Sequence, residues 1–427
     1  MDERPVVTCF LRNDSEILLC RRSDAVDRDG GLWDGITAPV TDDEGTERDP
    51  ETAARVEIAE ATGLDGPVTL VRAGEPFRVE DGDRRWLVHP FLFDCDTRDI
   101  ETGEGETDWV HPPELLRRET APSLWLSYDR VRPRVATVRE DRRHGSTWLA
   151  LRALETLRDE AALAVVESTD DRSTAERDGD DWAALAALAR RIRDARPAMA
   201  VIENRVNRAM FAAVDEGTPA AVERAARGAV EQSVGAGREA ARTAADTLPE
   251  RVATLSRSGT VETALRTTRP EAVLVAESRP GAEGVGVAEA LASMTDVTLT
   301  TDAAFGFELA EWDAETVLVG ADRVLPDGRV LNKAGTRSAA LSAAAADIDC
   351  LVVCASDKIA ATDGYDLEAR GAGELYDGDA DLSVANPTFD VTPADAVTAI
   401  VTEQGRLAPA EVAAVAQSHR EWATWDD

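Results

Sequence analysis

The first part of the chain alternates short apolar runs with turns, which is typical of strands. Residues 5–22 predict two strands joined by a turn at Asn13–Ser15, and residues 86–93 predict another strand. Residues 30–35 are expected to form a loop. Asp49 and Pro50 favour the start of a helix and Gly63 favours its end, so a helix is expected over residues 51–62.

A helical region follows a short basic segment. Residues 133–145 are interpreted as a linker, and Ser146 and Thr147 can cap a helix that runs from Trp148 to about residue 166. Residues 167–181 are polar and charged, which indicates a flexible loop. Helical patterns resume at residue 182 and continue to about residue 245, with breaks at Pro197 and at residues 217–219. These residues predict a small helical domain.

From residue 250 the pattern changes to continuous apolar strands separated by helices. Strands are expected at residues 252–255, 272–276, 297–300, 316–319 and 350–354. Such strands are typical of a parallel sheet covered by helices on both faces. The chain is therefore predicted to be an α/β protein with domains at residues 1–142, 143–248 and 249–427.

Composition narrows the possible partners. The 427 residues suggest two or three domains. The chain has 82 acidic and 47 basic residues and a net charge of -35, which disfavours binding to nucleic acid or to an anionic membrane. The excess of acidic residues and the scarcity of lysine resemble the composition of proteins from salt-accumulating halophilic archaea. Such a charge is tolerable in molar salt, because the Debye length falls to roughly 3 Å and repulsion between the carboxylates is screened. An acidic disordered chain is the alternative, and the apolar strands argue against it.

Other features agree with a cytoplasmic location. There is no signal peptide, and no apolar run approaches the length of a membrane span. The five cysteines show no metal-binding spacing, and those in apolar runs are expected to be core thiols.

Polar side chains follow the ends of the predicted parallel strands. They are found at residues 256–260, 277–280, 302, 322–323 and 356–358. Because ligands of open parallel sheets bind at the carboxyl ends of the strands, we expect one shared site. Ser256, Ser258 and Thr260 precede or begin a helix, whose free N–H groups suit a phosphate. For any single Ser or Asp, capping of a helix is the alternative role.

Lysine is so rare in this chain that its positions are informative. Only Lys333 and Lys358 among the 47 basic residues are lysines, and both lie near the predicted site. Together with Arg279 they can supply positive charge for a phosphate or carboxylate. Asp322 and Asn332 add an acid and an amide, so a phosphorylated small molecule is the expected ligand.

Residues 5–135 resemble a Nudix hydrolase domain, which implies an α/β/α sandwich with a mixed sheet. The second half of the family signature aligns with residues 56–64, where Glu57 and Glu60 match and share one helix face. These two carboxylates are the predicted ligands for Mg²⁺ or Mn²⁺ and the catalytic residues if the domain is active. Val56 and Ala61 replace an Arg and a Glu of the signature.

The first half of that signature is also incomplete. Strict spacing puts Asp42 and Arg48 at its Gly and Glu positions, whereas a four-residue insertion puts Ala38 and Glu44 there. The favoured interpretation is a Nudix-derived binding or regulatory module. Hydrolysis of a nucleoside diphosphate derivative is the alternative.

The rest of the chain, from about His144, resembles a family that contains the regulatory subunits of translation initiation factor 2B and two sugar-phosphate isomerases. The isomerases act on ribose 1,5-bisphosphate and methylthioribose 1-phosphate. The motifs that carry the resemblance are Ala195–Ala200, Glu277–Pro280, Val319–Arg323, Asn332–Thr336 and Asn386–Pro393. The resemblance implies a helical domain followed by a Rossmann-like domain, in a homodimer or higher oligomer.

The resemblance also assigns roles to residues. The isomerases use a Cys and an Asp as acid and base, which correspond here to Ser256 and Asp322. A hydroxyl is far less acidic than a thiol, and no His lies beside Ser256 in the sequence. The predicted ligand-binding residues are Gly145, Ser146, Ser256, Ser258, Thr260, Arg279, Asp322, Asn332, Lys333 and Lys358.

The favoured hypothesis is therefore a regulatory protein that binds a phosphorylated sugar or nucleotide. It would act through contacts with a translation-related protein or with a second copy of itself. Nudix hydrolysis and sugar-phosphate aldose–ketose isomerisation, with Asp322 as the catalytic acid or base, are the two alternatives.

Overall fold

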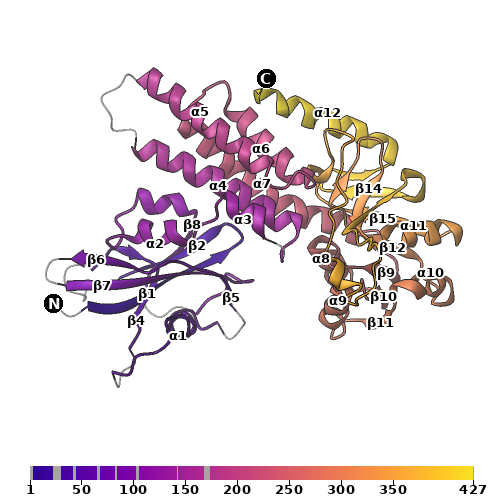
Figure 1. The fold of residues 1–427 in the computed structure, drawn as a ribbon, viewed down its shortest axis with the longest axis horizontal. Coiled ribbons are helices and arrows are strands. Elements are labelled where there is room, and N and C mark those ends of the chain that lie inside the picture. The colour runs from indigo at the N-terminus through magenta and orange to yellow at the C-terminus, as the bar shows by residue number, and fades with distance from the viewer. Residues whose placement is uncertain are drawn as a thin grey trace. The chain divides into compact units, whose positions relative to one another are not determined.

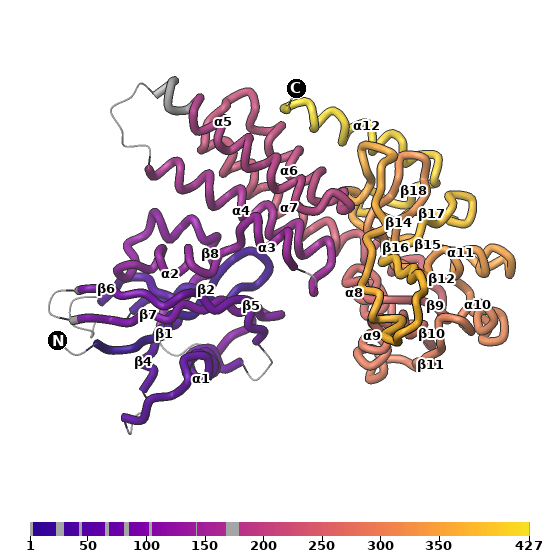
Figure 2. The backbone as a smooth tube through the Cα atoms, viewed as in Figure 1, coloured from indigo at the N-terminus to yellow at the C-terminus, as the bar shows by residue number. Residues whose placement is uncertain are grey.

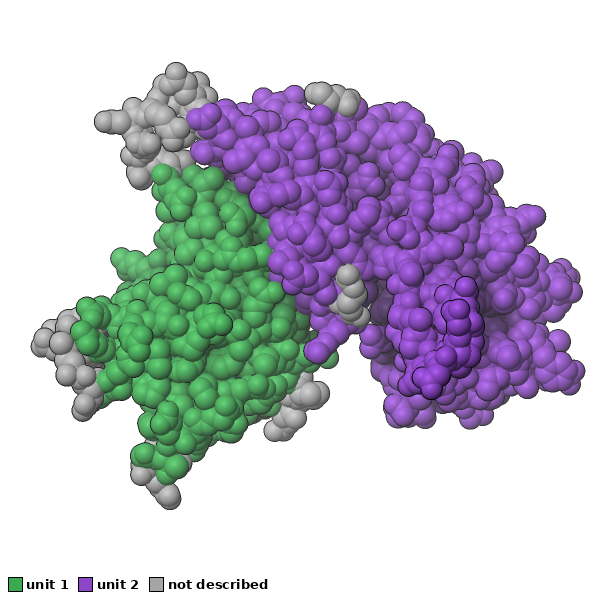
Figure 3. All heavy atoms as spheres, viewed as in Figure 1, with its two compact units in different colours: residues 1–134, 155–177 green, residues 135–154, 178–427 purple. Residues whose placement is uncertain are grey.

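We analysed a computed structural model of the chain, which forms two compact units (Figure 3). Unit 1 comprises residues 1–134 and 155–177, and unit 2 comprises residues 135–154 and 178–427. The structure describes residues 3–22, 30–41, 45–64, 68–81, 84–101, 105–141, 143–167 and 174–426. Among these, no helix combines the length and the apolar character needed to cross a membrane.

Unit 1 is built on an eight-stranded mixed sheet. Its central strand β1 pairs in parallel with β7 and antiparallel with β2 and β4. The strands are β1 (Glu3–Asn13), β2 (Glu16–Arg21), β3 (Trp33–Asp34), β4 (Ile36–Pro39), β5 (Thr69–Ala73), β6 (Phe77–Asp81), β7 (Arg84–Asp94) and β8 (Thr107–Val110).

Helices pack against both faces of this sheet because the side chains of a strand alternate between its faces. Cys9 on one face of β1 packs with Ile58 of α1 (Pro50–Thr62), and Phe10 on the other packs with Tyr128 of α2 (Leu124–Val131). A short 3-10 helix spans Pro112–Leu116. The result confirms the predicted α/β/α sandwich.

The predicted limits of α1 agree with the structure. The Asp49 carboxylate accepts a hydrogen bond from the Thr52 amide at 3.1 Å, and Pro50 is the first helical residue. Gly63 ends the helix with φ 62°, a left-handed conformation that glycine adopts without a steric cost.

Three local predictions missed secondary structure. Residues 30–35 contain the two-residue strand β3, and the expected linker contains helix α3 (Val135–Glu140). The expected loop at 167–181 is shorter, because α4 (Ser146–Glu167) extends to Glu167 and α5 (Thr174–Arg193) begins eight residues before Trp182. Helix α3 has exposed charged residues at Arg139 and Glu140, so its apolar pattern is too short to predict a helix.

The N-terminal part of unit 2 is helical. It contains α3, the first part of α4, most of α5, α6 (Ala200–Ala213) and α7 (Pro219–Ala245). Helices α6 and α7 pack against one another, and Thr218 caps α7 by accepting a hydrogen bond from the Ala221 amide at 3.2 Å.

The rest of unit 2 is a seven-stranded sheet in the order β11-β10-β9-β12-β15-β17-β18, with the antiparallel β18 at its edge (Figures 1 and 2). The strands are β9 (Arg251–Leu255), β10 (Ala272–Ala276), β11 (Asp296–Thr300), β12 (Thr316–Val319), β15 (Asp349–Val353), β17 (Ala399–Thr402) and β18 (Gly405–Leu407). The first six are parallel, which confirms the predicted Rossmann-like sheet.

Helices cover both faces of this sheet, as the continuous apolar strands predict. One face packs against α10 (Asp302–Glu311), α11 (Thr336–Ala345) and α12 (Val412–Trp422). The other packs against α7, α8 (Gly259–Thr268) and α9 (Glu283–Leu291).

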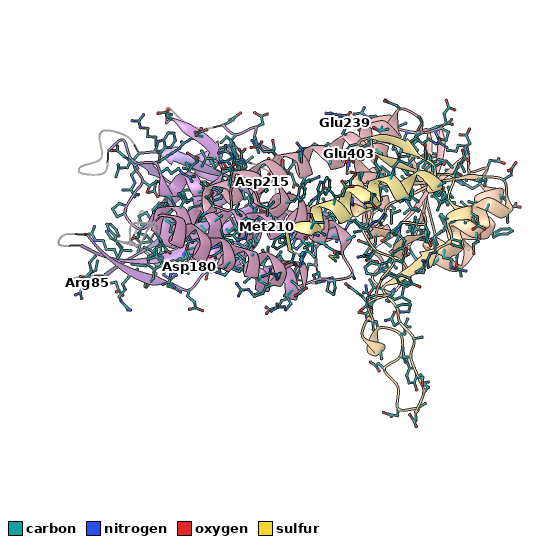
Figure 4. The ribbon with its side chains drawn as sticks, turned by 90° about the horizontal axis from the view of Figure 1, so that it is seen from above. Arg85, Asp180, Met210, Asp215, Glu239 and Glu403 are labelled. Atoms are coloured by element: carbon teal, nitrogen blue, oxygen red, sulfur yellow. The ribbon has the colours of Figure 1, made fainter. Side chains whose placement is uncertain are left out.

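Two further features of unit 2 were not predicted. A small antiparallel sheet joins β13 (Arg323–Val324), β14 (Val330–Lys333) and β16 (Phe389–Thr392). The 359–388 segment before β16 is irregular apart from a 3-10 turn at Ala372–Glu374, and Figure 4 shows this long segment extending from the rest of the unit.

Candidate functional site

A polar cavity of about 490 Å³ lies at the carboxyl ends of strands β9 and β12 of unit 2. From β9 the chain continues outward to β10 and β11, and then returns to the other side of β9 to form β12. This reversal of strand order is the position at which open α/β sheets bind their ligands. Seven of the predicted ligand-binding residues line the cavity: Gly145, Ser146, Ser256, Ser258, Asp322, Asn332 and Lys333.

Strand β9 leads directly into the cavity. Ser256 follows it with φ 60°, and its amide donates a hydrogen bond to the Ser278 hydroxyl at 2.7 Å. A left-handed conformation at a residue other than glycine is uncommon and is concentrated at functional sites. Ser258 caps helix α8, whose first amides therefore face the same region.

Strand β12 brings Asp322 to the opposite side of the cavity. Its carboxylate accepts a hydrogen bond from the hydroxyl of Ser146, the first residue of α4, at 3.0 Å. Gly320 lies between the strand and Asp322, and a Cβ there would approach the Ser258 hydroxyl to 2.7 Å. The glycine thus permits the two loops to lie close together.

Lys333 and Asn332 reach the cavity from the end of β14. The Lys333 ammonium donates a hydrogen bond to the Glu283 carboxylate at 2.6 Å, and Arg370 lies 3.8 Å from the same carboxylate. The Asn332 amide donates to the Thr336 hydroxyl at 2.9 Å, which holds the start of α11. Lys333 therefore places a positive charge at the wall of the cavity, where it is paired with Glu283. The side-chain amide of Asn332 has a structural role.

Three predicted ligand-binding residues lie outside this cavity. Thr260 is in the first turn of α8. The Arg279 side chain is 67% exposed and pairs with Glu277 at 2.9 Å, while Lys358 is buried and donates a hydrogen bond to the carbonyl of Ala321. Lys358 thereby braces the loop that carries Asp322.

The cavity also contains a histidine that the sequence analysis did not select. His144 Nδ1 lies 2.8 Å from the Asp141 carboxylate, and its ring stacks on Trp148 with centroids 3.8 Å apart. Burial alone would raise the pKa of Asp141, but hydrogen bonds from His144 and Arg143 outweigh it and lower the pKa. The expectation that residues 133–145 form a linker concealed this pair.

Two segments that are far apart in the sequence supply further charged side chains to the cavity. Arg196 precedes α6, and it pairs with Glu368 of the 359–388 segment at 3.2 Å. Arg370 of the same segment pairs with Glu374 at 2.6 Å. No local pattern in the sequence indicates that these side chains meet at the cavity.

The cavity is lined by equal numbers of positive and negative side chains, but not every positive side chain is paired with a carboxylate. Five cations line it (Arg143, Arg196, Arg257, Lys333 and Arg370) together with five carboxylates (Asp141, Glu283, Asp322, Glu368 and Glu374). Arg143 and Arg257 have no carboxylate partner within ion-pair distance among the residues that the structure describes. These two guanidinium groups can bind an oxyanion.

No thiol of the described residues lines this cavity. Cys350 and Cys354 are buried in or just after β15, and burial raises the pKa of each to about 12. This agrees with the interpretation of these cysteines as core thiols.

Unit 1 contains a separate cavity of about 300 Å³ beside the Nudix-like helix α1. Glu57 lines it, while Glu60 is exposed outside it. Burial, followed by repulsion from Glu60, raises the pKa of Glu57. Asp34 also lines the cavity but is paired with Arg22 at 2.5 Å.

These groups do not make a complete metal site within the described ranges. No cluster of three potential His, Cys, Asp or Glu ligands occurs there. Asp42 and Glu44, two candidates for the Nudix signature, lie outside the described residues. The fit to Mg²⁺ or Mn²⁺ is limited to Glu57 and Glu60, so no chemical step is assigned to a metal.

Comparison with known proteins separates a Nudix-like N-terminal part from the rest of the chain. Residues 2–149 match the model of the NUDIX domain. Methylthioribose-1-phosphate isomerase of Roseiflexus sp. (strain RS-1) is 36% identical over 173 residues, which cover 37% of this chain and 48% of the relative. A putative methylthioribose-1-phosphate isomerase of Sulfolobus acidocaldarius is 36% identical over 148 residues, covering 32% of this chain and 40% of the relative. The chain spans about half the length of the curated relatives it matches.

Solved structures give the same fold for the larger part of the chain. Translation initiation factor eIF-2B of Pyrococcus horikoshii OT3 matches with a TM-score of 0.54 and 27% identity over 64% of this chain and 95% of that chain. The 5-methylthioribose 1-phosphate isomerase of the same organism matches with a TM-score of 0.53 and 19% identity, covering 74% of this chain and 90% of that chain. Because the initiation factor 2 subunit family model matches residues 142–409, the chain belongs to that family.

Proposed function

We propose that the unit 2 cavity binds a pentose 1-phosphate and interconverts its aldose and ketose forms. In support, two of the curated relatives are named as isomerases of methylthioribose 1-phosphate. One observation carries the proposal: Ser256 and Asp322 follow adjacent parallel strands and line one polar cavity that also contains unpaired arginines. The cations and the first amides of α8 would hold the phosphate, and Asp322 would orient a sugar hydroxyl.

The proposal is tested by turnover. The protein is incubated with methylthioribose 1-phosphate or ribose 1,5-bisphosphate in dilute and molar KCl, and the ketose product is followed by NMR. We expect ketose in at least one reaction and a loss of about 100-fold or more in Asp322→Asn, because one charged hydrogen bond to the sugar is removed where the reaction occurs. Binding of both sugars without any ketose formation would refute isomerisation.

A regulatory role is the second candidate, and Ser256 favours it. The family's isomerases have a thiol at this position, and the hydroxyl here is a far weaker acid. In this role the cavity would bind a phosphorylated sugar or nucleotide without turnover, and a translation-related protein would respond to it. Affinity for a sugar phosphate together with no turnover at any salt concentration would favour this candidate over the first.

Unit 1 is proposed to be a binding module for a nucleoside diphosphate derivative. The support is its cavity beside Glu57 and the limited set of metal ligands among the described residues. Phosphate release from such compounds with Mg²⁺ or Mn²⁺, abolished in Glu57→Gln, would instead establish Nudix hydrolysis.

The remaining expectations also belong to this proposal. We propose domains at residues 1–142, 143–248 and 249–427, a cytoplasmic location in a halophilic archaeon, and a homodimer or higher oligomer. Light scattering of the full chain in molar KCl measures the oligomeric state. A monomer at micromolar concentration would contradict the proposed assembly.

A further inference from the structure

The proposed isomerisation needs a group that can give and take protons near neutral pH. Ser256 is unsuited to this role because it lacks the acidity of a thiol. No cysteine among the described residues lines the cavity. Asp322 accepts a hydrogen bond from Ser146, and the Glu283, Glu368 and Glu374 carboxylates are paired with Lys333, Arg196 and Arg370.

His144 has the features of a positioned proton carrier. Asp141 holds its Nδ1 at 2.8 Å, and stacking on Trp148 at 3.8 Å with an interplanar angle of 12° fixes the plane of the ring. Nε2 has no hydrogen-bond partner within the described part of the chain. A carboxylate on one ring nitrogen sets the tautomer and stabilises the imidazolium, which leaves the other nitrogen for the reaction.

The location of His144 links it to the groups that would hold the sugar. It lies two residues before Ser146, whose hydroxyl donates to Asp322, and all three residues line the cavity. The Arg196 guanidinium donates a hydrogen bond to the carbonyl of Asp141 at 2.9 Å. The segment that carries His144 is therefore anchored on both sides.

We propose that His144 is the catalytic acid and base of the isomerisation, which rests on the proposed function of the cavity. The imidazolium gives its proton to the ring oxygen of the pentose 1-phosphate as the bond from C1 to that oxygen breaks, and the oxygen keeps the electron pair. The hydrogen on C2 then passes to C1 with its electron pair. The electron pair of the O–H bond on C2 forms the new carbonyl, and its proton returns to His144.

The first test is kinetic. In His144→Gln we expect kcat for methylthioribose 1-phosphate to fall about 10²- to 10⁴-fold, the range for loss of a general acid–base group. The Kd measured by calorimetry should change by less than about threefold, because binding of the phosphate is assigned to other groups. Addition of imidazole should restore part of the activity of His144→Ala, which a purely structural role would not allow.

The pH profile supplies a second readout. Because the reaction starts from the imidazolium, kcat of the unchanged protein should fall as the pH rises and the ring loses its proton. In His144→Gln this decrease of kcat with rising pH, the alkaline limb of the pH profile, should be absent. The charged groups around the His144 segment are Asp141, Arg143, Arg196, Arg257 and Asp322, and their substitution would shift the limb without removing it.

His89→Gln is the matched control, because His89 lies on β7 in unit 1 and does not line the cavity. It should keep the rate, the pH limb and the Kd. Thermal unfolding shows whether each variant is folded. If His144→Gln does not fold, His144→Asn takes its place. If the unchanged protein binds the sugar but makes no ketose, both the proposed function and this role for His144 are refuted. If turnover and its pH limb survive in His144→Gln, or if only the Kd changes, the role alone is refuted.

Discussion

At the scale of single residues, the two lysines of the chain have different surroundings. Lys358 donates a hydrogen bond to a backbone carbonyl, whereas Lys333 meets Glu283 at the wall of the cavity. A compact ammonium on a flexible side chain can exchange a carboxylate for a phosphate oxygen. Lys333 is therefore the lysine that we expect to contact the ligand.

Lys333→Met should weaken binding of ribose 1,5-bisphosphate by about 10- to 100-fold, because a charge-assisted hydrogen bond contributes roughly 1.5–3 kcal/mol. Calorimetry measures the change. The substitution also leaves Glu283 without its lysine, so the double variant Lys333→Met with Glu283→Gln is the control. An affinity that returns to the original value in the double variant would mean that Lys333 only neutralises Glu283.

A second ionic group is structural. Asp357 accepts hydrogen bonds from Arg205 at 2.9 Å and from Arg208 at 2.9 Å, and the Arg205 side chain is completely buried. Burial alone would raise the pKa of Asp357, but the two guanidinium groups outweigh it and lower the pKa below its usual value. The network joins α6 to the turn after β15.

Asp357→Asn should lower the free energy of unfolding by about 3–5 kcal/mol, because Arg205 is left buried without a counter-charge. Urea unfolding at neutral pH measures the loss. The lowered pKa adds a dependence on pH: the stabilisation is complete above the unfolded pKa of about 3.9 and is lost as the pH falls through the folded value. The exposed Asp377→Asn is the control, and in molar KCl, where repulsion between carboxylates is screened, it should change neither property. Equal unfolding curves for the two variants would contradict this role.

At the scale of elements, the close approach of two loops defines the cavity. The loop after β9 carries Ser258 and the loop after β12 begins with Gly320, where no larger residue fits without moving the serine. The moving atom is the end of a side chain, so the backbone can remain in place. Gly320 therefore affects the shape of the cavity more than the stability of the sheet.

Gly320→Ala should lower the affinity for ribose 1,5-bisphosphate by about fivefold, because a displaced Ser258 hydroxyl intrudes on the phosphate region and one hydrogen bond of about 1 kcal/mol is disturbed. Calorimetry measures the affinity, and thermal unfolding should show little change. Gly237→Ala is the control: it lies within α7, a Cβ there meets nothing within 4 Å, and it should add about 0.5–1 kcal/mol of stability without affecting the affinity. An affinity unchanged by both substitutions would exclude a steric role for Gly320.

The elements differ in how far the sequence predicts them. Strand β10 is a continuous apolar run, β9 and β12 are largely apolar, and α1 has Asp49 and Gly63 at its ends, so local chemistry determines these elements. Helix α3 and the start of α5 lack a continuous apolar stripe. Helix α3 instead packs through the buried Val138, a tertiary contact that no local pattern contains.

The same distinction applies to the site. The rule for parallel strands identified Ser256 and Asp322, because a strand end is a local feature with a known place in the sheet. His144 and Arg196 come from the helical part of unit 2, and Arg370 comes from an irregular segment. They reach the cavity through contacts between residues far apart in the sequence, such as those of Arg196 with Asp141 and Glu368. Only the three-dimensional structure shows it.

At the scale of the whole molecule, the net charge of -35 should make stability depend on salt. The midpoint of thermal unfolding should rise by several degrees or more between 0.05 and 1 M KCl, because the Debye length falls from roughly 14 to 3 Å and repulsion between carboxylates is screened. Circular dichroism measures the midpoint.

Substitution of the exposed Asp377, Asp379 and Asp381 by Asn should raise the midpoint in dilute salt and reduce its salt dependence, since those charges no longer repel their neighbours. Sucrose is the uncharged control: it stabilises by exclusion from the surface and should act equally on both proteins. A midpoint that falls with KCl, or a variant as salt-dependent as the original chain, would show that charge repulsion does not limit stability.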